Sequence, residues 1–121
     1  MDKDKSKLVN IATLLEKNLE SDLYNKYKHK LGININADYL YQWALISLNE
    51  GSTEKAISFI ISALDLDRRH SPTLHLLKSM VTGLSRDFYE DGGADYKQRY
   101  DDFDELIKII KKKAISIKKK S

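Results

Sequence analysis

The stretch that decides the fold is ADYLYQWALISLNEGSTEKAISFIISALDLDR, residues 37–68. Its apolar and small residues recur at helical spacing in two stripes: Leu40, Trp43, Ala44 and Ser47, then Ala56, Ile57, Ile60, Ala63 and Leu64. Asn36 can cap the first helix, since its side chain accepts a hydrogen bond from a first-turn amide, and Ser52 can cap the second. Gly51 lies between them and readily takes the left-handed conformation that ends a helix. The pattern predicts two antiparallel helices joined by a tight turn.

Three further helices are predicted around this hairpin, over residues 5–30, 72–90 and 96–119. The first presents one apolar face: Leu8, Ile11, Ala12, Leu15, Leu19 and Leu23. The second begins at Ser71 as N-cap with Pro72 in the first helical position. The third begins after Asp95, which has capping-box spacing to Gln98. We therefore expect an all-α protein with a single domain over residues 1–121, about five helices and a long C-terminal helix.

The last predicted helix carries a heptad seam. Its members alternate spacings of four and three: Tyr96, Tyr100, Phe103, Ile107, Ile110, Ala114 and Ile117. This seam can pack against the preceding helix of the same chain. It can also meet a second copy or a partner helix, which would make the protein an oligomerising structural subunit.

The hairpin resembles the tetratricopeptide repeat (TPR). Its small residues Ala44, Ala56 and Ala63, its Gly51 and the run at 63–67 match the repeat in register, over nearly one unit of about 34 residues. Ser47 and Arg68 depart from the pattern, which usually has a large apolar residue and a proline at these places. A partial second repeat follows with Leu74, Leu77 and Val81, although Lys78 stands where a small residue belongs.

The resemblance implies a non-enzymatic module that binds a protein partner, as an adaptor, chaperone or assembly component. The first helix of such a repeat usually lines the groove that takes a peptide or helix. The residues that would face the groove are Asp38, Tyr41, Gln42, Leu45 and Asn49, joined by His75 and Ser79 from the following helix. Tyr41 and Leu45 occupy places where chaperone-binding repeats have Lys and Asn, so an acidic chaperone tail does not fit as ligand.

The charges are segregated along the chain. The formal net charge of +3 hides a segment at 87–105 with two cations and eight carboxylates, followed by residues 106–121 with seven lysines and no acid. Nucleic acid could bind the lysine-rich end through Lys111, Lys112, Lys113, Lys118, Lys119 and Lys120. Together with Ile109, Ile110, Ile115 and Ile117, the same lysines could instead lie on an anionic membrane surface. The alternative is a solvated helix end that balances the preceding acids. No aromatic residues lie among the lysines, so a dedicated stacking site for bases is unsupported.

The residue inventory argues against catalytic and metal chemistry. There are no cysteines, so thiolate metal sites and cysteine nucleophiles are excluded. His29, His70 and His75 lack the spacing of a ligand set, and we interpret His70 and the neighbouring aspartates as a solvated helix end. Residues 87–98 match a calcium loop only in part, since Gln98 replaces the bidentate Glu. With no apolar signal core or membrane span, we expect a cytoplasmic protein without a cofactor.

Overall fold

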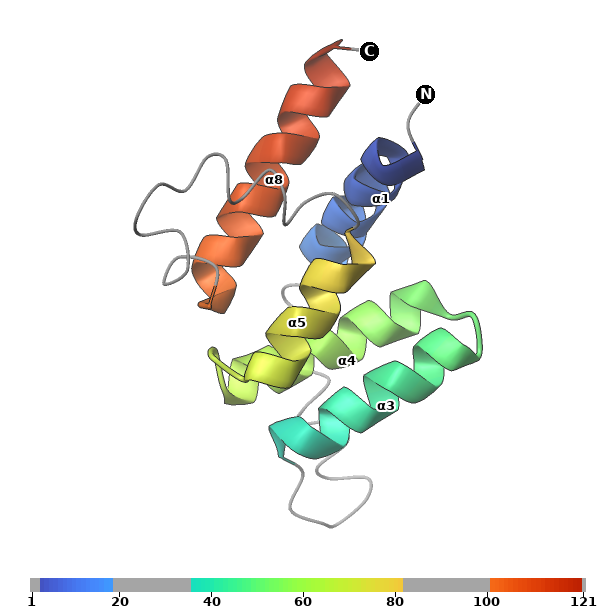
Figure 1. The fold of residues 1–121 in the computed structure, drawn as a ribbon, viewed down its shortest axis with the longest axis vertical. Coiled ribbons are helices and arrows are strands. Elements are labelled where there is room, and N and C mark those ends of the chain that lie inside the picture. The colour runs from blue at the N-terminus through green and yellow to red at the C-terminus, as the bar shows by residue number, and fades with distance from the viewer. Residues whose placement is uncertain (1–2, 19–35, 82–100, 121) are drawn as a thin grey trace.

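The computed structural model describes residues 3–18, 36–81 and 101–120, and every regular element in these ranges is an α-helix (Figure 1). The five helices are α1 (Lys3–Asn18), α3 (Ala37–Asn49), α4 (Thr53–Leu66), α5 (Ser71–Met80) and α8 (Phe103–Lys120). Their buried apolar side chains form one cluster to which all five helices contribute. The prediction of an all-α fold with a long C-terminal helix is confirmed.

The predicted antiparallel hairpin is formed by α3 and α4. Asn36 caps α3, because its Oδ1 accepts a hydrogen bond from the backbone N–H of Tyr39 at 3.0 Å. Gly51 has a φ of +83°, in the left-handed region, and its N–H donates to the carbonyl of Leu48 at 3.0 Å. Ser52 stands at the N-cap of α4 as predicted, although its hydroxyl makes no capping hydrogen bond. The turn therefore depends on the conformation of the glycine and on backbone hydrogen bonds.

The central helix of the fold is α4, which packs against α3, α1 and α5. The predicted stripe of α4 is fully buried, and the predicted small residues Ala44, Ala56 and Ala63 are buried completely. Phe59 and Ser62, outside the stripe, are also buried. A helix with neighbours on several sides is buried over more of its circumference than the one face that a single stripe predicts.

A second antiparallel pair joins the two ends of the described chain. In Figure 1, α1 and α8 lie side by side and run in opposite directions, and they pack against each other. The described members of the predicted seam are buried, except for Ile117, which is partly buried against the core. Leu106 is also fully buried. The seam thus packs within the chain, where α8 lies against α1.

Two predicted helix boundaries are wrong. Residues 101–102 are not helical and α8 begins at Phe103, because the Oδ1 of Asp102 accepts hydrogen bonds from the N–H groups of Asp104 (3.0 Å) and Glu105 (3.4 Å). The expected cap at residues 95–98 lies outside the described residues.

The other wrong boundary concerns α5, which has His70 and not Ser71 at its N-cap. It ends at Met80, since Val81 has left the helix and its N–H donates to the carbonyl of Lys78. The predicted continuation over 82–90, and that of the first helix over 19–30, fall outside the described residues.

Candidate interaction surfaces

The predicted groove residues lie on the outer sides of α3 and α5. Asp38, Gln42 and Asn49 are exposed, while Tyr41 and Leu45 are half-buried. These residues lie away from the side of α3 on which Leu40, Ala44 and Ser47 are buried. On α5, His75 and Ser79 are exposed on the side opposite its buried face. The sets on the two helices thus face outward, as the prediction requires of binding residues.

His70 connects the beginnings of the two helices, and sequence reasoning missed it. Its side chain is only 10% exposed and lies between Asp38, whose Oδ1 is 2.7 Å from Nε2, and Thr73, whose Oγ1 is 2.6 Å from Nδ1. The ring of Tyr41 meets the imidazole edge-on, with 6.1 Å between centroids. The interpretation of His70 as a solvated helix end is therefore wrong.

Which ring nitrogen of His70 donates depends on its tautomer. A carboxylate only accepts, so the tautomer with its proton on Nε2 donates to Asp38 and leaves Nδ1 to accept from the Thr73 hydroxyl. Because Thr73 is fully buried, this bond also satisfies a polar group in the core. The sequence offered one local signal for the bond within α5: His70 directly precedes Ser71-Pro72, and Thr73 follows three residues later. Its contact with Asp38, 32 residues earlier in the chain, had no local signature.

A second side of α3 exposes apolar side chains that the prediction did not assign to binding. Tyr39 is 49% exposed and Ile46 is 54% exposed. Trp43 lies between them along the helix, half-buried, with its ring edge-on to Phe59 at 5.6 Å between centroids. The prediction that Trp43 belongs to the apolar stripe of this helix fits the contact. Ile46 was missed because it falls outside the apolar stripe.

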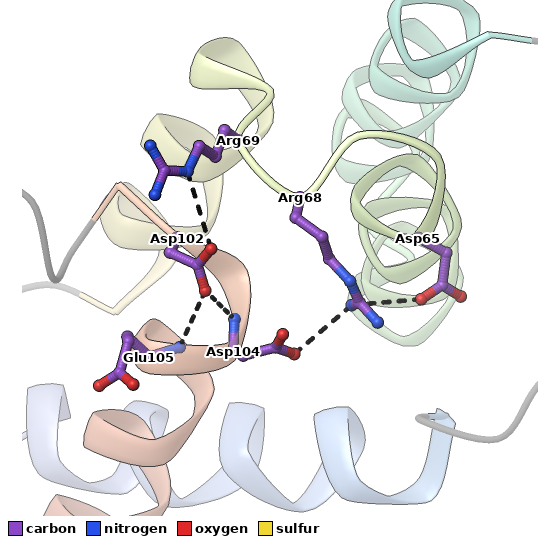
Figure 2. A network of polar contacts seen from close by, with 6 residues as sticks. All are labelled: Asp65, Arg68, Arg69, Asp102, Asp104 and Glu105. Carbon is purple, nitrogen blue, oxygen red and sulfur yellow. Dashed lines mark hydrogen bonds and ion pairs between the residues drawn. The ribbon is translucent and has the colours of Figure 1, made fainter.

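A network of charges holds the beginning of α8 against the connection between α4 and α5 (Figure 2). The guanidinium of Arg68 lies 3.4 Å from Asp65 and 3.7 Å from Asp104, and Arg69 lies 3.8 Å from Asp102. The backbone N–H of Phe103 also donates to the carbonyl of Arg68 at 3.1 Å. These ion pairs are largely exposed, so each contributes about 0–1 kcal/mol.

The predicted polyanion-binding lysines lie on the later part of α8. Lys112, Lys118 and Lys119 are exposed, and Lys111 and Lys113 are half-buried. Lys120 is the last residue of the helix. Lys108 and Ile115 are exposed on the same helix, with Ile115 at 54%; the prediction included Ile115 in the membrane alternative but did not assign Lys108 to binding.

Comparison with known proteins gives no relative: no family model, curated protein or solved structure matches the chain. Among the residues that the structure describes, no helix has the length and apolar character needed to cross a bilayer. The same ranges contain no group of three or more His, Cys, Asp or Glu residues arranged to hold a metal ion. The functional argument therefore depends on the surfaces of α3, α5 and α8.

Proposed function

We propose that the protein is a non-enzymatic interaction module that acts in the cytoplasm as an adaptor, chaperone or assembly component. It binds a peptide or helix of a partner protein on the outer side of α3 and α5. The proposal retains the TPR-like interpretation of the hairpin, in which α3 and α5 correspond to the first helices of successive repeats.

The observation that carries the proposal is the contact through His70. Its hydrogen bonds to Asp38 of α3 and to Thr73 of α5 hold the beginnings of these helices together. Two helices that belong to successive repeats would need such a connection to present one continuous surface. The resemblance assigns that surface to ligand binding.

The side chains on this surface suit recognition of a peptide or helix. Tyr41 and Leu45 offer half-buried apolar anchors, and Asp38, Gln42 and Asn49 surround them with exposed polar groups. Apolar anchors give most of the affinity in such interfaces, and the polar rim gives selectivity. A partner with an amphipathic helix or an extended apolar segment fits this arrangement.

The test is affinity capture from an extract of the source cell after nuclease treatment, read by mass spectrometry. The variants are Leu45→Lys and, as the matched control, Ile46→Lys on the next position of α3. Both replace a side chain outside the fully buried core with the same cation. We expect a discrete partner to be lost with Leu45→Lys and retained with Ile46→Lys.

Two other outcomes would contradict the proposal. If only Ile46→Lys loses the partner, the partner binds the side of α3 that carries Tyr39 and Ile46. If both variants retain the partner, α3 is not part of the interface. Circular dichroism of each variant checks that the helices remain folded.

The alternative of an oligomerising subunit receives no support from the seam of α8. Phe103, Ile107 and Ile110 are buried within the chain, where α8 packs on α1. A second copy could reach these side chains only if α1 moved away. The alternative of polyanion binding is favoured by the exposed lysines of α8, among them Lys112, Lys118 and Lys119.

A further inference from the structure

One side of α8 carries cations around an exposed isoleucine. Beside its buried face, one side of the helix holds Lys108, Lys111, Lys112, Ile115, Lys118 and Lys119, which we call the basic face. These positions follow one another at spacings of one, three or four residues, so they share one side of an α-helix. The α8 sequence after Glu105 contains no acidic residue.

The acidic residues at the beginning of α8 do not neutralise this face. Asp102 and Asp104 pair with Arg69 and Arg68, and Asp101 lies 3.4 Å from Lys78. Among the described residues, Glu105 pairs with Lys108, at 3.7 Å. Lys108 thus balances a preceding acid, as the alternative interpretation of the lysines requires. In the described parts of the chain, Lys111, Lys112 and Lys119 make no ion pair.

The antiparallel arrangement of α1 and α8 adds to the positive charge. The beginning of α1 and the end of α8 lie at the same end of the molecule (Figure 1), and Lys7, in the first half of α1, is exposed. Cations gathered at the end of a helix are also favoured by its macrodipole, so the fold tolerates them. An anionic surface that approaches this end meets several lysines at once.

The isoleucine distinguishes between two kinds of anionic partner. Ile115 is 54% exposed at the centre of the basic face. A helix that lies on a membrane surface places lysines near the headgroups and an apolar side chain at the boundary with the acyl chains. Nucleic acid would use the lysines alone, and residues 104–121 contain no Arg, Asn, Gln or aromatic residue to read or stack on bases.

We propose that the basic face of α8 binds the surface of a bilayer rich in anionic phospholipids. The lysines contact the headgroup phosphates and Ile115 enters the interfacial region. The helix stays packed on α1 through Phe103, Ile107 and Ile110, so the whole domain attaches to the surface as a unit. This inference is independent of the partner surface on α3 and α5.

The test uses the full chain in co-sedimentation with vesicles of phosphatidylcholine, alone or mixed with phosphatidylserine. Binding is expected only to the mixed vesicles and should fall steeply with salt. Lys112→Glu/Lys119→Glu should reduce the affinity at least about tenfold, because each lysine near an anionic surface adds to binding. The matched control, Lys17→Glu/Lys55→Glu, makes the same change in net charge away from the basic face and should bind as the unchanged chain does.

Ile115 gives the second measurement. Ile115→Ser should weaken vesicle binding several-fold, and Ile115→Trp should retain or strengthen it, because tryptophan prefers the interface. A duplex DNA of matched charge is the competing probe.

Three outcomes would contradict the inference. If both double variants lose vesicle affinity equally, net charge alone determines binding and the basic face has no specific role. Stronger binding to DNA, insensitive to Ile115→Ser, would assign the face to nucleic acid. Failure to bind mixed vesicles at low salt would also overturn the inference.

Discussion

The two antiparallel helix pairs of this protein are assembled in different ways. α3 and α4 follow each other directly, joined by a turn at Gly51, and small side chains are buried completely where they cross. α1 and α8 come from opposite ends of the chain and are brought together by facing apolar surfaces. The first pair closes a short loop, whereas the second must close a long one before its contacts stabilise anything. We therefore expect the hairpin to be an early, local unit and the α1–α8 pair to form late.

The largest expected effect comes from deleting most of α8. Truncation after Leu106 removes Ile107, Ile110 and Ala114 and uncovers the apolar face of α1. Since each buried aliphatic side chain contributes about 1.5–3 kcal/mol, the free energy of unfolding should fall by about 5 kcal/mol or more. Urea unfolding followed by circular dichroism measures this loss. Truncation after Ile117, which spares the buried seam, is the control and should unfold near the original urea concentration.

An unchanged urea midpoint after truncation at Leu106 would show that α1 and α8 do not depend on each other. Partner capture by α3 and α5 would then also be unaffected. If capture and folding are lost together, the terminal helix is required for the domain to fold.

The next largest loss of stability is expected when one buried side chain from each helix pair is truncated to alanine. Leu40→Ala in α3 and Ile110→Ala in α8 each empty a site that is 0% exposed, so each should cost about 2–5 kcal/mol. Their kinetics should differ. Leu40→Ala should mainly slow refolding, because the hairpin forms early, and Ile110→Ala should mainly speed unfolding. Stopped-flow measurements in urea give both rates. If Leu40→Ala mainly sped unfolding and Ile110→Ala mainly slowed refolding, the α1–α8 pair would form before the hairpin.

A smaller effect is expected at the turn of the hairpin. Gly51 has a φ of +83°, and a Cβ added there would meet nothing within 4 Å. The cost of Gly51→Ala is then conformational alone, about 1 kcal/mol. Gly51→Asn is the control and should cost less, because asparagine tolerates the left-handed region. Equal costs for the two variants in urea unfolding would mean that the turn changes conformation.

The smallest effect is expected where the α4–α5 connection holds α8. Arg68→Gln removes the ion pairs to Asp65 and Asp104 and the guanidinium 5.1 Å from the ring centroid of Phe103. These contacts are exposed, so the loss should be about 1 kcal/mol or less. At 1 M salt, where the Debye length is about 3 Å, most of the ion-pair part should disappear. A loss above about 2 kcal/mol would show that this connection holds α8 more firmly than its apolar face does.

The same contrast explains what the sequence could predict of the fold. The hairpin was predicted closely, because Asn36, Gly51 and the buried alanines are local signals. The seam of α8 was also predicted, since periodicity identifies a buried face. Periodicity does not name the helix that covers that face, so α1 was missed as its partner. Likewise, one stripe on α4 could not predict that Phe59 and Ser62 are buried by further neighbours.

The candidate surfaces also combine features that local sequence patterns indicate with contacts that only the packing of the helices reveals. Tyr41, Leu45 and Asn49, which the resemblance assigned to the groove, lie on the side of α3 away from its buried face. The contact between Asp38 and His70 depends on how two helices meet, so no local pattern predicts it. The charge segregation in the sequence indicated a basic end. Only the structure shows that Asp101, Asp102 and Asp104 pair with Lys78, Arg69 and Arg68, which lie outside that end.

The antiparallel run of α1 beside α8 also determines how the domain would respond to a pulling force. The beginning of α1 and the end of α8 lie at the same end of the molecule (Figure 1). Tension applied between residues 3 and 120 would therefore peel these helices apart one turn at a time, and would not shear all their contacts at once. Separation in this direction is mechanically weak. The hairpin, which lies at the other end of the pair, would bear load only after α1 and α8 had come apart.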